Sequence, residues 1–250
     1  MTQFQELLFR DLIREIHNHR RELRNDPLSF FSAIRGAQSS GQLMVFGRAV
    51  NGWPPKARPS QLGSPQQTNS LMQQIRGTLR QDRGCPMRWV IDREGDHDYN
   101  TRKSAFWRVI RQVTLALEPT AEEQGRWSSF LIWSNLYKVS PFDGGNPGSA
   151  LKTLQFPFCL QLIEKEISYW APNRLLFLTG LDWAHPFLQS DGFAYQQHRS
   201  GTLVQSIGTL SVSSAGLSIP VVIAPHPRGK PERPLVEEIL RAFAVKRAGG

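Results

Sequence analysis

The chain has 250 residues, 40% of them hydrophobic, a formal net charge of +9 and a sequence pI of about 10.1. This length allows one large domain or two small ones with a sizeable core. Its apolar runs are shorter than the roughly 18 residues of a membrane span, and residues 1–24 lack the apolar block of a signal peptide. The positive charge favours a polyanionic partner such as DNA or RNA, although a basic protein need not bind nucleic acid.

Hydrophobic spacing predicts the elements in chain order. Residues 3–24 carry apolar side chains four positions apart, which is typical of one buried helix face. Asp26 opens a second helical segment that Gly36 would end. The remaining predictions are a strand over 42–49, a proline-rich loop over 54–66, helices over 66–83 and 101–119, a strand over 128–141, a helix over 149–172 kinked at Pro157, a strand over 173–180, one or two exposed strands over 201–219, a core strand over 219–227 and a helix over 234–247.

The order of these elements predicts the fold class. Helices and core strands alternate, and the core strands are continuous apolar runs. Both features are typical of parallel strands that are covered by helices on both faces. We therefore predict an α/β protein with a three-layer α/β/α architecture and a mostly parallel central sheet. The two cysteines, Cys85 and Cys159, are too few for a disulfide scaffold, so we expect reduced thiols, with a single disulfide between them as the alternative.

Polar residues follow three of the predicted core strands. Arg48 and Asn51 follow the first strand, Asn135 and Lys138 the second, and His226 the last. In an open parallel sheet, ligands bind beyond the carboxyl ends of the strands. We therefore expect these side chains to lie on one rim of the sheet.

Each candidate on this rim also has a purely structural interpretation. The amide of Asn135 both donates and accepts, so it can read the edge of a nucleobase, or it can close a turn. His226 lies between Pro225 and Pro227, which restrict the backbone, but a lone loop histidine is often only structural. Asn51 precedes a glycine, and Asn-Gly is a common turn dipeptide. The sequence contains no G-x-S-x-G motif and no Walker loop.

The densest acidic cluster lies within residues 92–104. Asp96, His97 and Asp98 raise the possibility of a metal site. Adjacent residues seldom all face one ion, and further ligands from distant segments would be needed. We interpret the cluster as a solvated loop.

The rim motifs together resemble those of the uracil-DNA glycosylase superfamily. "VFGRAVNGWP" is similar to the family's first motif, a loop that begins with Gly and carries the residue that positions water. "FLIWSNLYKVSP" resembles the strand end whose Asn recognises the uracil edge, and "VVIAPHPRGK" resembles the late His-Pro motif. "LLFLTGLDWAHPF" is similar to the segment that precedes the His-Pro loop. The resemblance spans residues 40–245.

The resemblance implies a monofunctional DNA N-glycosylase, a DNA-repair hydrolase that flips a damaged base, uracil or a related one, and hydrolyses its N-glycosidic bond. Its catalytic residues would be His226, which donates to a base carbonyl as in an oxyanion hole, and Asn51, with a nearby backbone carbonyl as the alternative group that holds the water. Asn135 would bind the base edge, and Phe46 or Trp53 would stack on the base, with a plain core role as the alternative for either ring. No metal or organic cofactor is implied.

The same resemblance implies that DNA, single- or double-stranded, is the partner. Cations would grip phosphates or enter the duplex beside the flipped nucleotide. We expect a cytoplasmic monomer, nucleoid-associated if bacterial, with no membrane association. The candidate contacts to the DNA backbone are Arg48, Lys138, Arg228, Lys230 and Arg233.

Two departures from the family pattern leave other functions open. Arg228 stands where the family has a small polar residue, and no Asp follows Gly47. A non-catalytic nucleic-acid-binding protein of the same fold is one alternative, and an enzyme acting on a small nucleotide or another phosphate ligand is a second. We predict an N-terminal helical extension over 1–38 and a uracil-DNA glycosylase-like α/β domain over 39–250.

Overall fold

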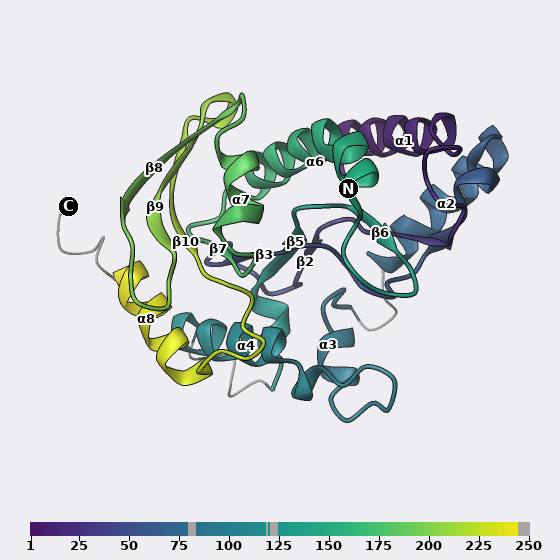
Figure 1. Ribbon diagram of the computed structural model, residues 1–250. Coiled ribbons are helices and arrows are strands. Elements are labelled where there is room, and N and C mark those ends of the chain that lie inside the picture. The colour runs from purple at the N-terminus through teal and green to yellow at the C-terminus, as the bar shows by residue number, and fades with distance from the viewer. Residues whose placement is uncertain (80–83, 119, 121–124, 245–250) are drawn as a thin grey trace. The chain divides into compact units, whose positions relative to one another are not determined.

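The computed structural model describes the chain except for residues 80–83, 119, 121–124 and 245–250 (Figure 1). Two compact units share the chain, and each is assembled from three separate stretches. The predicted domain boundary at residue 38 stays a prediction. Unit 1 consists of Met1–Ala33, Arg48–Gln81 and Asn135–Glu166, and unit 2 consists of Ile34–Gly47, Asp82–Ser134 and Ile167–Gly250.

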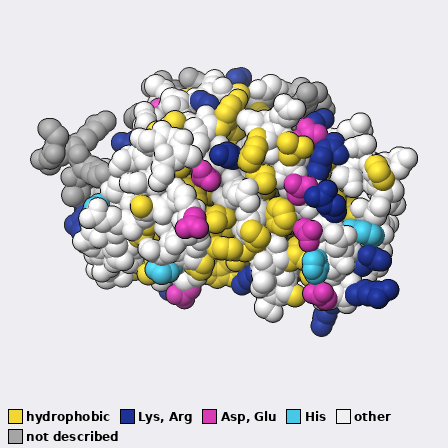
Figure 2. Space-filling view, turned by 90° about the horizontal axis from the view of Figure 1, so that it is seen from above, with side chains coloured by type: hydrophobic (Ala, Val, Ile, Leu, Met, Phe, Trp, Pro, Cys, Tyr) yellow, Lys and Arg dark blue, Asp and Glu magenta, His cyan; other side chains and the backbone are white. Residues whose placement is uncertain are grey.

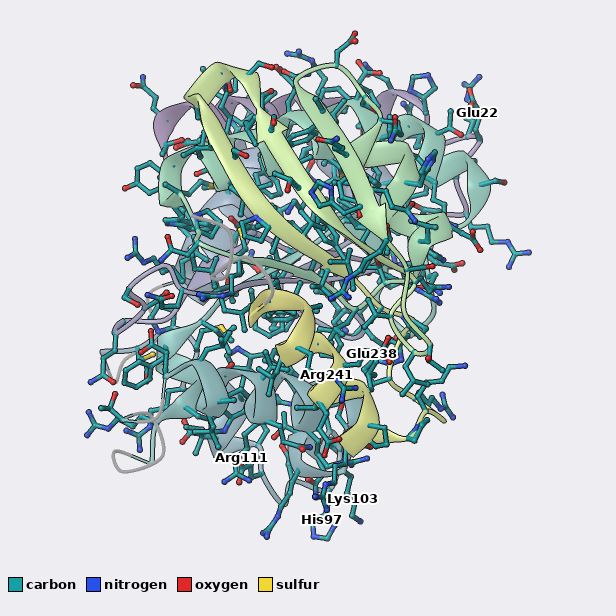
Figure 3. All side chains as sticks on the ribbon, turned by 90° about the vertical axis from the view of Figure 1, so that its left-hand side faces the viewer. Glu22, His97, Lys103, Arg111, Glu238 and Arg241 are labelled. Atoms are coloured by element: carbon teal, nitrogen blue, oxygen red, sulfur yellow. The ribbon has the colours of Figure 1, made fainter. Side chains whose placement is uncertain are left out.

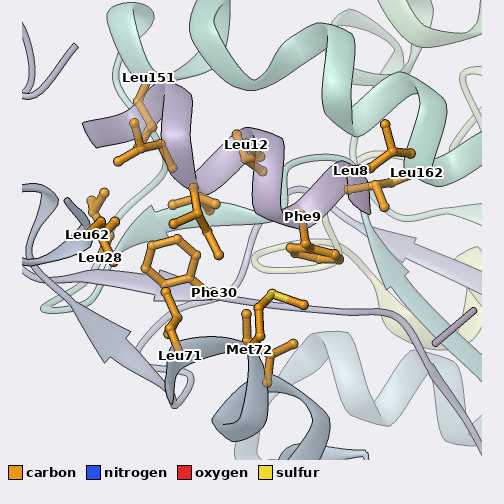
Figure 4. Packing of buried hydrophobic residues seen from close by; sticks show 14 residues of the cluster. Leu8, Phe9, Leu12, Leu28, Phe30, Leu62, Leu71, Met72, Leu151 and Leu162 are labelled. Atoms are coloured by element: carbon orange, nitrogen blue, oxygen red, sulfur yellow. The ribbon is translucent and has the colours of Figure 1, made fainter. Parts of the chain in front are cut away.

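Helices of unit 1 pack around one apolar cluster. The predicted N-terminal helix is confirmed as α1 (Gln3–Asn18), and Thr2 caps it in a reciprocal pair of hydrogen bonds with Gln5. α2 (Pro65–Thr78), the 3₁₀ turn η1 (Pro59–Leu62) and the first part of α6 (Ser149–Trp170) also contribute. Figure 4 shows this cluster, which includes Leu8, Phe9, Leu12, Leu28, Phe30, Leu62, Leu71, Met72, Leu151 and Leu162.

A three-stranded sheet completes unit 1. β1 (Leu28–Phe30) pairs antiparallel with β4 (Lys56–Ala57) on one side and with β6 (Val139–Pro141) on the other. The helix predicted from Asp26 to Gly36 is therefore wrong. Every residue from 28 to 34 is buried, which suits a short strand between two partners rather than a helix with one exposed face.

Unit 2 contains a seven-stranded sheet in the order β2-β5-β3-β7-β10-β9-β8. β3 pairs parallel with β7, and β7 with β10, whereas β2–β5, β10–β9 and β9–β8 are antiparallel. The sheet is thus mixed, and parallel pairing is confirmed at its centre only. The strands are β2 (Ile34–Arg35), β3 (Met44–Gly47), β5 (Ile132–Asn135), β7 (Leu175–Phe177), β8 (Phe193–Arg199), β9 (Ser206–Val212) and β10 (Leu217–Ile223).

Short connections explain the antiparallel edge of this sheet. β8, β9 and β10 follow one another in the chain, and a turn of few residues can join antiparallel strands only. The 3₁₀ turn η4 (Ser213–Ala215) and Gly216, with φ of 62°, reverse the chain between β9 and β10. The sequence prediction missed β8, whose residues are mostly exposed.

Of the helices of unit 2, α4 and α8 were predicted, whereas α3 and α7, which contains Pro186, were not. The predicted helix ends at residues 83, 119 and 247 lie outside the described residues. α4 and α8 lie side by side (Figure 1). Among the described residues, no helix has both the length and the apolar character that crossing a membrane requires. The helices and 3₁₀ turns are α3 (Trp89–Asp92), η2 (Thr101–Lys103), α4 (Ala105–Leu117), η3 (Trp127–Phe130), α7 (Leu181–Leu188) and α8 (Glu232–Ala244).

The order of the central strands matters for the site. At their starts, the Ile132 N–H donates to the Leu43 carbonyl at 3.0 Å, and beyond their ends the Tyr137 N–H donates to the Arg48 carbonyl at 3.0 Å. β5 and β3 therefore run in the same direction. Along β5-β3-β7-β10 the chain order reverses at β3. Ligands of doubly wound sheets bind at the carboxyl ends of the strands beside such a reversal.

Candidate functional site

His226 follows the carboxyl end of β10 in unit 2. The Ala224 N–H still donates to the Phe177 carbonyl at 2.8 Å, and the chain then leaves the sheet. The backbone N–H of Arg228 donates to Nδ1 of His226 at 3.2 Å. Since Nδ1 accepts this bond, a neutral ring carries its proton on Nε2. The loop thus fixes the tautomer of a partly exposed histidine.

The loop that begins at His226 and runs to Glu232, called here the His226 loop, is anchored on α4 at two points. The ring of Phe106 lies nearly parallel to the His226 ring, with the centroids 5.9 Å apart and an angle of 10°. Two residues later, Arg108 binds Glu232 through its Nε at 2.9 Å and its Nη2 at 2.5 Å. The hydrogen bond from Arg108 lowers the pKa of Glu232. One helix therefore holds both ends of the loop.

A hollow of about 660 Å3 lies beside the His226 loop. Lys103 and Arg228 are exposed and make no ion pair within the described part of the chain, whereas Asp96 lies 3.8 Å from Arg93. Figure 3 labels His97 and Lys103 at this part of the molecule. The lining comes from unit 2: Gly95, Asp96, His97, Asp98, Tyr99, Asn100, Lys103, Ser104, Ala105, Arg108, His226, Arg228, Gly229 and Glu232.

The acidic loop that the sequence singled out forms one wall of this hollow. His97 and Asp98 are exposed, as expected for a solvated loop. Within the described ranges, no three His, Cys, Asp or Glu side chains gather in a way that could hold a metal ion. The loop therefore contributes charge to the hollow rather than a set of ligands.

Asn135 is the last residue of β5, and only 1% of it is exposed. Residues 135–140, called here the Asn135 segment, lie in unit 1 and form hydrogen bonds with several other segments of that unit. The Phe31 N–H donates to the Lys138 carbonyl at 2.8 Å, and the Ser140 hydroxyl donates to the Val50 carbonyl at 2.6 Å. The segment is therefore held in one conformation.

Lys138 is fully buried and pairs with Glu166 of α6, with 2.8 Å between Nζ and Oε2. The prediction that Lys138 grips a DNA phosphate is therefore wrong, because its ammonium group is sealed from solvent by the protein. Its backbone N–H donates to the sulfur of Cys159 at 3.4 Å. Burial raises the pKa of Cys159 to about 12, so this thiol stays protonated at neutral pH.

The two predicted base-stacking residues are core side chains. Phe46 is completely buried and stacks on Phe177, with the centroids 4.5 Å apart and an angle of 7°. The prediction that Phe46 stacks on a base is wrong, because its ring already fills the interior of unit 2. Trp53 is also buried, and its ring meets Phe31 edge-on at 5.9 Å in unit 1.

Asn51 is exposed and lies in unit 1, as Asn135 does. Its Oδ1 would lie 3.1 Å from a Cβ atom added at Gly144, so the Asn51 amide closely approaches the backbone at that glycine. Gly144 has a φ of 114°, which other residues rarely adopt. The structure thus places Asn51 against the loop that follows the Asn135 segment.

The remaining predicted cations differ in their surroundings. Arg48 is half-buried, whereas Arg228 and Lys230 are exposed. Arg233 is exposed too and pairs with Glu237 at 3.0 Å. On the face shown in Figure 2, Lys and Arg side chains are interspersed with acidic ones. Arg228 and Lys230 are therefore the most available of the predicted phosphate contacts.

Sequence reasoning missed the residues that hold the two predicted groups. These are Phe106 and Arg108 for the His226 loop, and Gln155 and Glu166 for the Asn135 segment. A signal existed in α6, where Gln155, Cys159 and Glu166 recur at helical spacing on the same side as buried leucines and isoleucines. Polar residues within an apolar helix face indicate a buried polar contact.

No protein-family model matches the chain, and no curated protein was found to match it. The resemblance of the rim motifs to the uracil-DNA glycosylase superfamily therefore stays a prediction.

Proposed function

We propose that the protein is a DNA N-glycosylase that flips uracil, or a related damaged base, out of the stack and hydrolyses its N-glycosidic bond. His226 carries this proposal. Its Nδ1 accepts the Arg228 N–H, so the neutral ring has its donor at Nε2. The flanking prolines and the Phe106 ring restrict the position of this donor.

The proposed chemistry needs such a donor. As the bond between C1′ of the sugar and the base nitrogen breaks, its electron pair moves to the base, and negative charge develops on a base carbonyl oxygen. Nε2–H of His226 would stabilise that oxygen without giving up its proton. Water then adds to C1′, and the proton that it loses neutralises the base. Asn51 would orient this water, and Asn135 would bind the base edge.

The position of His226 supports its proposed role. His226 follows the carboxyl end of β10, a strand of the seven-stranded sheet of unit 2. Ligands of open α/β sheets bind beyond the carboxyl ends of their strands. Because Asn135 is only 1% exposed, the proposal requires that its surroundings open to admit a base.

The charge supports a nucleic-acid partner. The net charge is +9, and Arg228 and Lys230, two and four positions after His226, have exposed side chains. Phosphate contacts by such cations supply most of the affinity of non-specific DNA binding. In the proposed complex these two residues bind phosphates beside the flipped nucleotide.

Strand cleavage tests the proposal. Labelled oligonucleotides with one uracil or one hypoxanthine, single- and double-stranded, are incubated with the full chain and then treated with alkali to break abasic sites. We expect wild type to cleave, and His226→Ala to lower the rate by about a hundredfold or more. Asn135→Ala should lose the preference for uracil over thymine. His185→Ala, an exposed histidine of α7, is the matched control and should behave as wild type.

Two outcomes would contradict the proposal. Cleavage that persists undiminished in both His226→Ala and Asn135→Ala would remove the assigned site. Tight binding to oligonucleotides without cleavage of any lesion would favour the non-catalytic nucleic-acid-binding protein.

A further inference from the structure

The side-chain amide of Gln155 on α6 forms two hydrogen bonds with the backbone of Val139, four residues after Asn135. The Val139 N–H donates to Oε1 of Gln155 at 2.9 Å, and Nε2 of Gln155 donates to the Val139 carbonyl at 2.8 Å. Gln155 is completely buried. One side-chain amide thus makes the pair of bonds that a neighbouring strand would make, on the side of β6 that β1 does not occupy.

The ion pair between Lys138 and Glu166 fixes the same stretch through the adjacent residue. Both side chains are buried, at 0% and 1% exposure, and 2.8 Å separates the charged atoms. Cys159 accepts the Lys138 N–H one turn of α6 away from Gln155. Consecutive residues of the Asn135 segment are therefore tied to one face of a single helix.

These contacts specify register more than they add stability. A buried ion pair is often no more stabilising than well-packed apolar residues of the same volume. A slip of the segment by one residue would leave the Lys138 ammonium without its carboxylate and Gln155 without its backbone partners. Such a slip would also turn every side chain of the segment to the opposite face. These buried polar side chains therefore make every alternative register of the Asn135 segment energetically costly.

We propose that Gln155, Lys138 and Glu166 are positioning residues that fix the Asn135 segment, so that the Asn135 amide meets the base edge in one orientation. This inference rests on the function proposed above for Asn135. The residues do not touch the base; they act through the backbone between Asn135 and Val139. A misplacement of about 1 Å in a site can cost about a hundredfold in rate, so loosening the segment lowers turnover.

Gln155→Leu is the variant that tests the proposal most sharply. It keeps a buried side chain of similar size and removes both bonds to Val139. Hydrogen exchange of the backbone amides of residues 135–140, which needs no substrate, should become about tenfold faster. The rate constant kcat on a single-stranded uracil oligonucleotide should fall by about ten- to a hundredfold with KM unchanged. Gln155→Met fills the same site with an unbranched apolar side chain, removes the same two bonds and should give the same change in both measurements.

Leu12→Ala is the control for lost stability, because Leu12 is buried in the apolar cluster of the same unit and its side chain has no group that could form a hydrogen bond with the backbone of the segment. The kcat of Gln155→Leu and that of Leu12→Ala are compared per folded molecule, and Leu12→Ala should keep the wild-type kcat. If Leu12→Ala lowers kcat per folded molecule as much as Gln155→Leu does, the three residues are only structural and the proposal is wrong. Unchanged hydrogen exchange in Gln155→Leu would overturn the proposal as well.

If wild type cleaves no lesion, the proposed function fails, while the exchange measurement still decides whether Gln155 fixes the segment. Should Gln155→Leu not fold, Gln155→Met carries the same comparison.

Discussion

The Asn135 segment and the His226 loop are held in place by different kinds of contact. The segment is buried and fixed by a side-chain amide, a thiol and an ion pair from one helix. The loop is partly exposed and fixed by two prolines, an aromatic ring and an ion pair near the surface. Buried polar contacts are costly to break, whereas surface contacts tolerate loss. The residue proposed to read the base is thus set rigidly, and the proposed donor is held more lightly.

Lys138→Met should have the largest effect, because it removes from the buried carboxylate of Glu166 the ammonium group with which it pairs at 2.8 Å. We expect the free energy of unfolding to fall by about 3–5 kcal/mol. The double variant Lys138→Met with Glu166→Leu should recover most of this loss, since it replaces the pair with apolar groups. Urea unfolding measures both variants. A double variant as unstable as the single one would show that the pair contributes more than charge compensation.

The reactivity of the Cys159 thiol measures whether the Asn135 segment opens to solvent. Burial raises its pKa to about 12, and its sulfur accepts the Lys138 N–H, so iodoacetamide at about pH 8 should modify the half-buried Cys85 and spare Cys159. Because the pKa is raised, the contribution of this thiol to stability is constant below the ordinary thiol pKa near 9.0 and falls as pH rises towards 12. Mass spectrometry locates the label, and Cys159→Ala provides the chain without this pH dependence. Labelling of Cys159 at the rate of Cys85 would contradict a closed segment.

Phe106→Leu should loosen the His226 loop without unfolding unit 2. The nearly parallel ring pair contributes about 0.5–1.5 kcal/mol beyond its buried area. In proton NMR spectra, the ring protons of His226 should lose the ring-current shift in Phe106→Leu and keep it in Phe106→Tyr. Equal spectra for the two variants would mean that Phe106 does not set the position of the imidazole.

Arg108→Met should have the smallest effect, in contrast to Lys138→Met. The Arg108–Glu232 pair is partly exposed, with 39% and 24% of the side chains accessible, so it contributes under about 1 kcal/mol. Because the pKa of Glu232 is lowered, this contribution is complete above the ordinary glutamate pKa and disappears as pH falls through the lowered value. Thermal unfolding between neutral and acidic pH measures it. A loss as large as that of Lys138→Met would remove the distinction between the two regions.

Local patterns predicted much of the fold. The apolar spacing of residues 3–24 predicted α1, and that of 101–119 predicted α4, because each helix buries a single stripe. β1, which lies within the helix predicted over 26–36, was missed because it pairs with residues 139–141, a contact that helical or strand periodicity within the segment does not encode. The antiparallel edge was missed because β8 has few buried side chains.

The backbone positions of the candidate residues were predictable, but their packing was not. Asn135 ends β5 and His226 follows β10, close to the predicted strand ends. The burial of Lys138 depends on Glu166, 28 positions later on another element, and no local pattern joins the two. Phe46 is an aromatic residue in a strand, and its stacking on Phe177 depends on the pairing of β3 with β7.

Cleavage of a uracil oligonucleotide by wild type and His226→Ala tests the central claim most directly. The donor at Nε2 of His226 predicts excision by wild type and a fall in rate of about a hundredfold or more in the variant, with His185→Ala unchanged. Excision by His226→Ala at the wild-type rate, or no excision by wild type, would contradict the account.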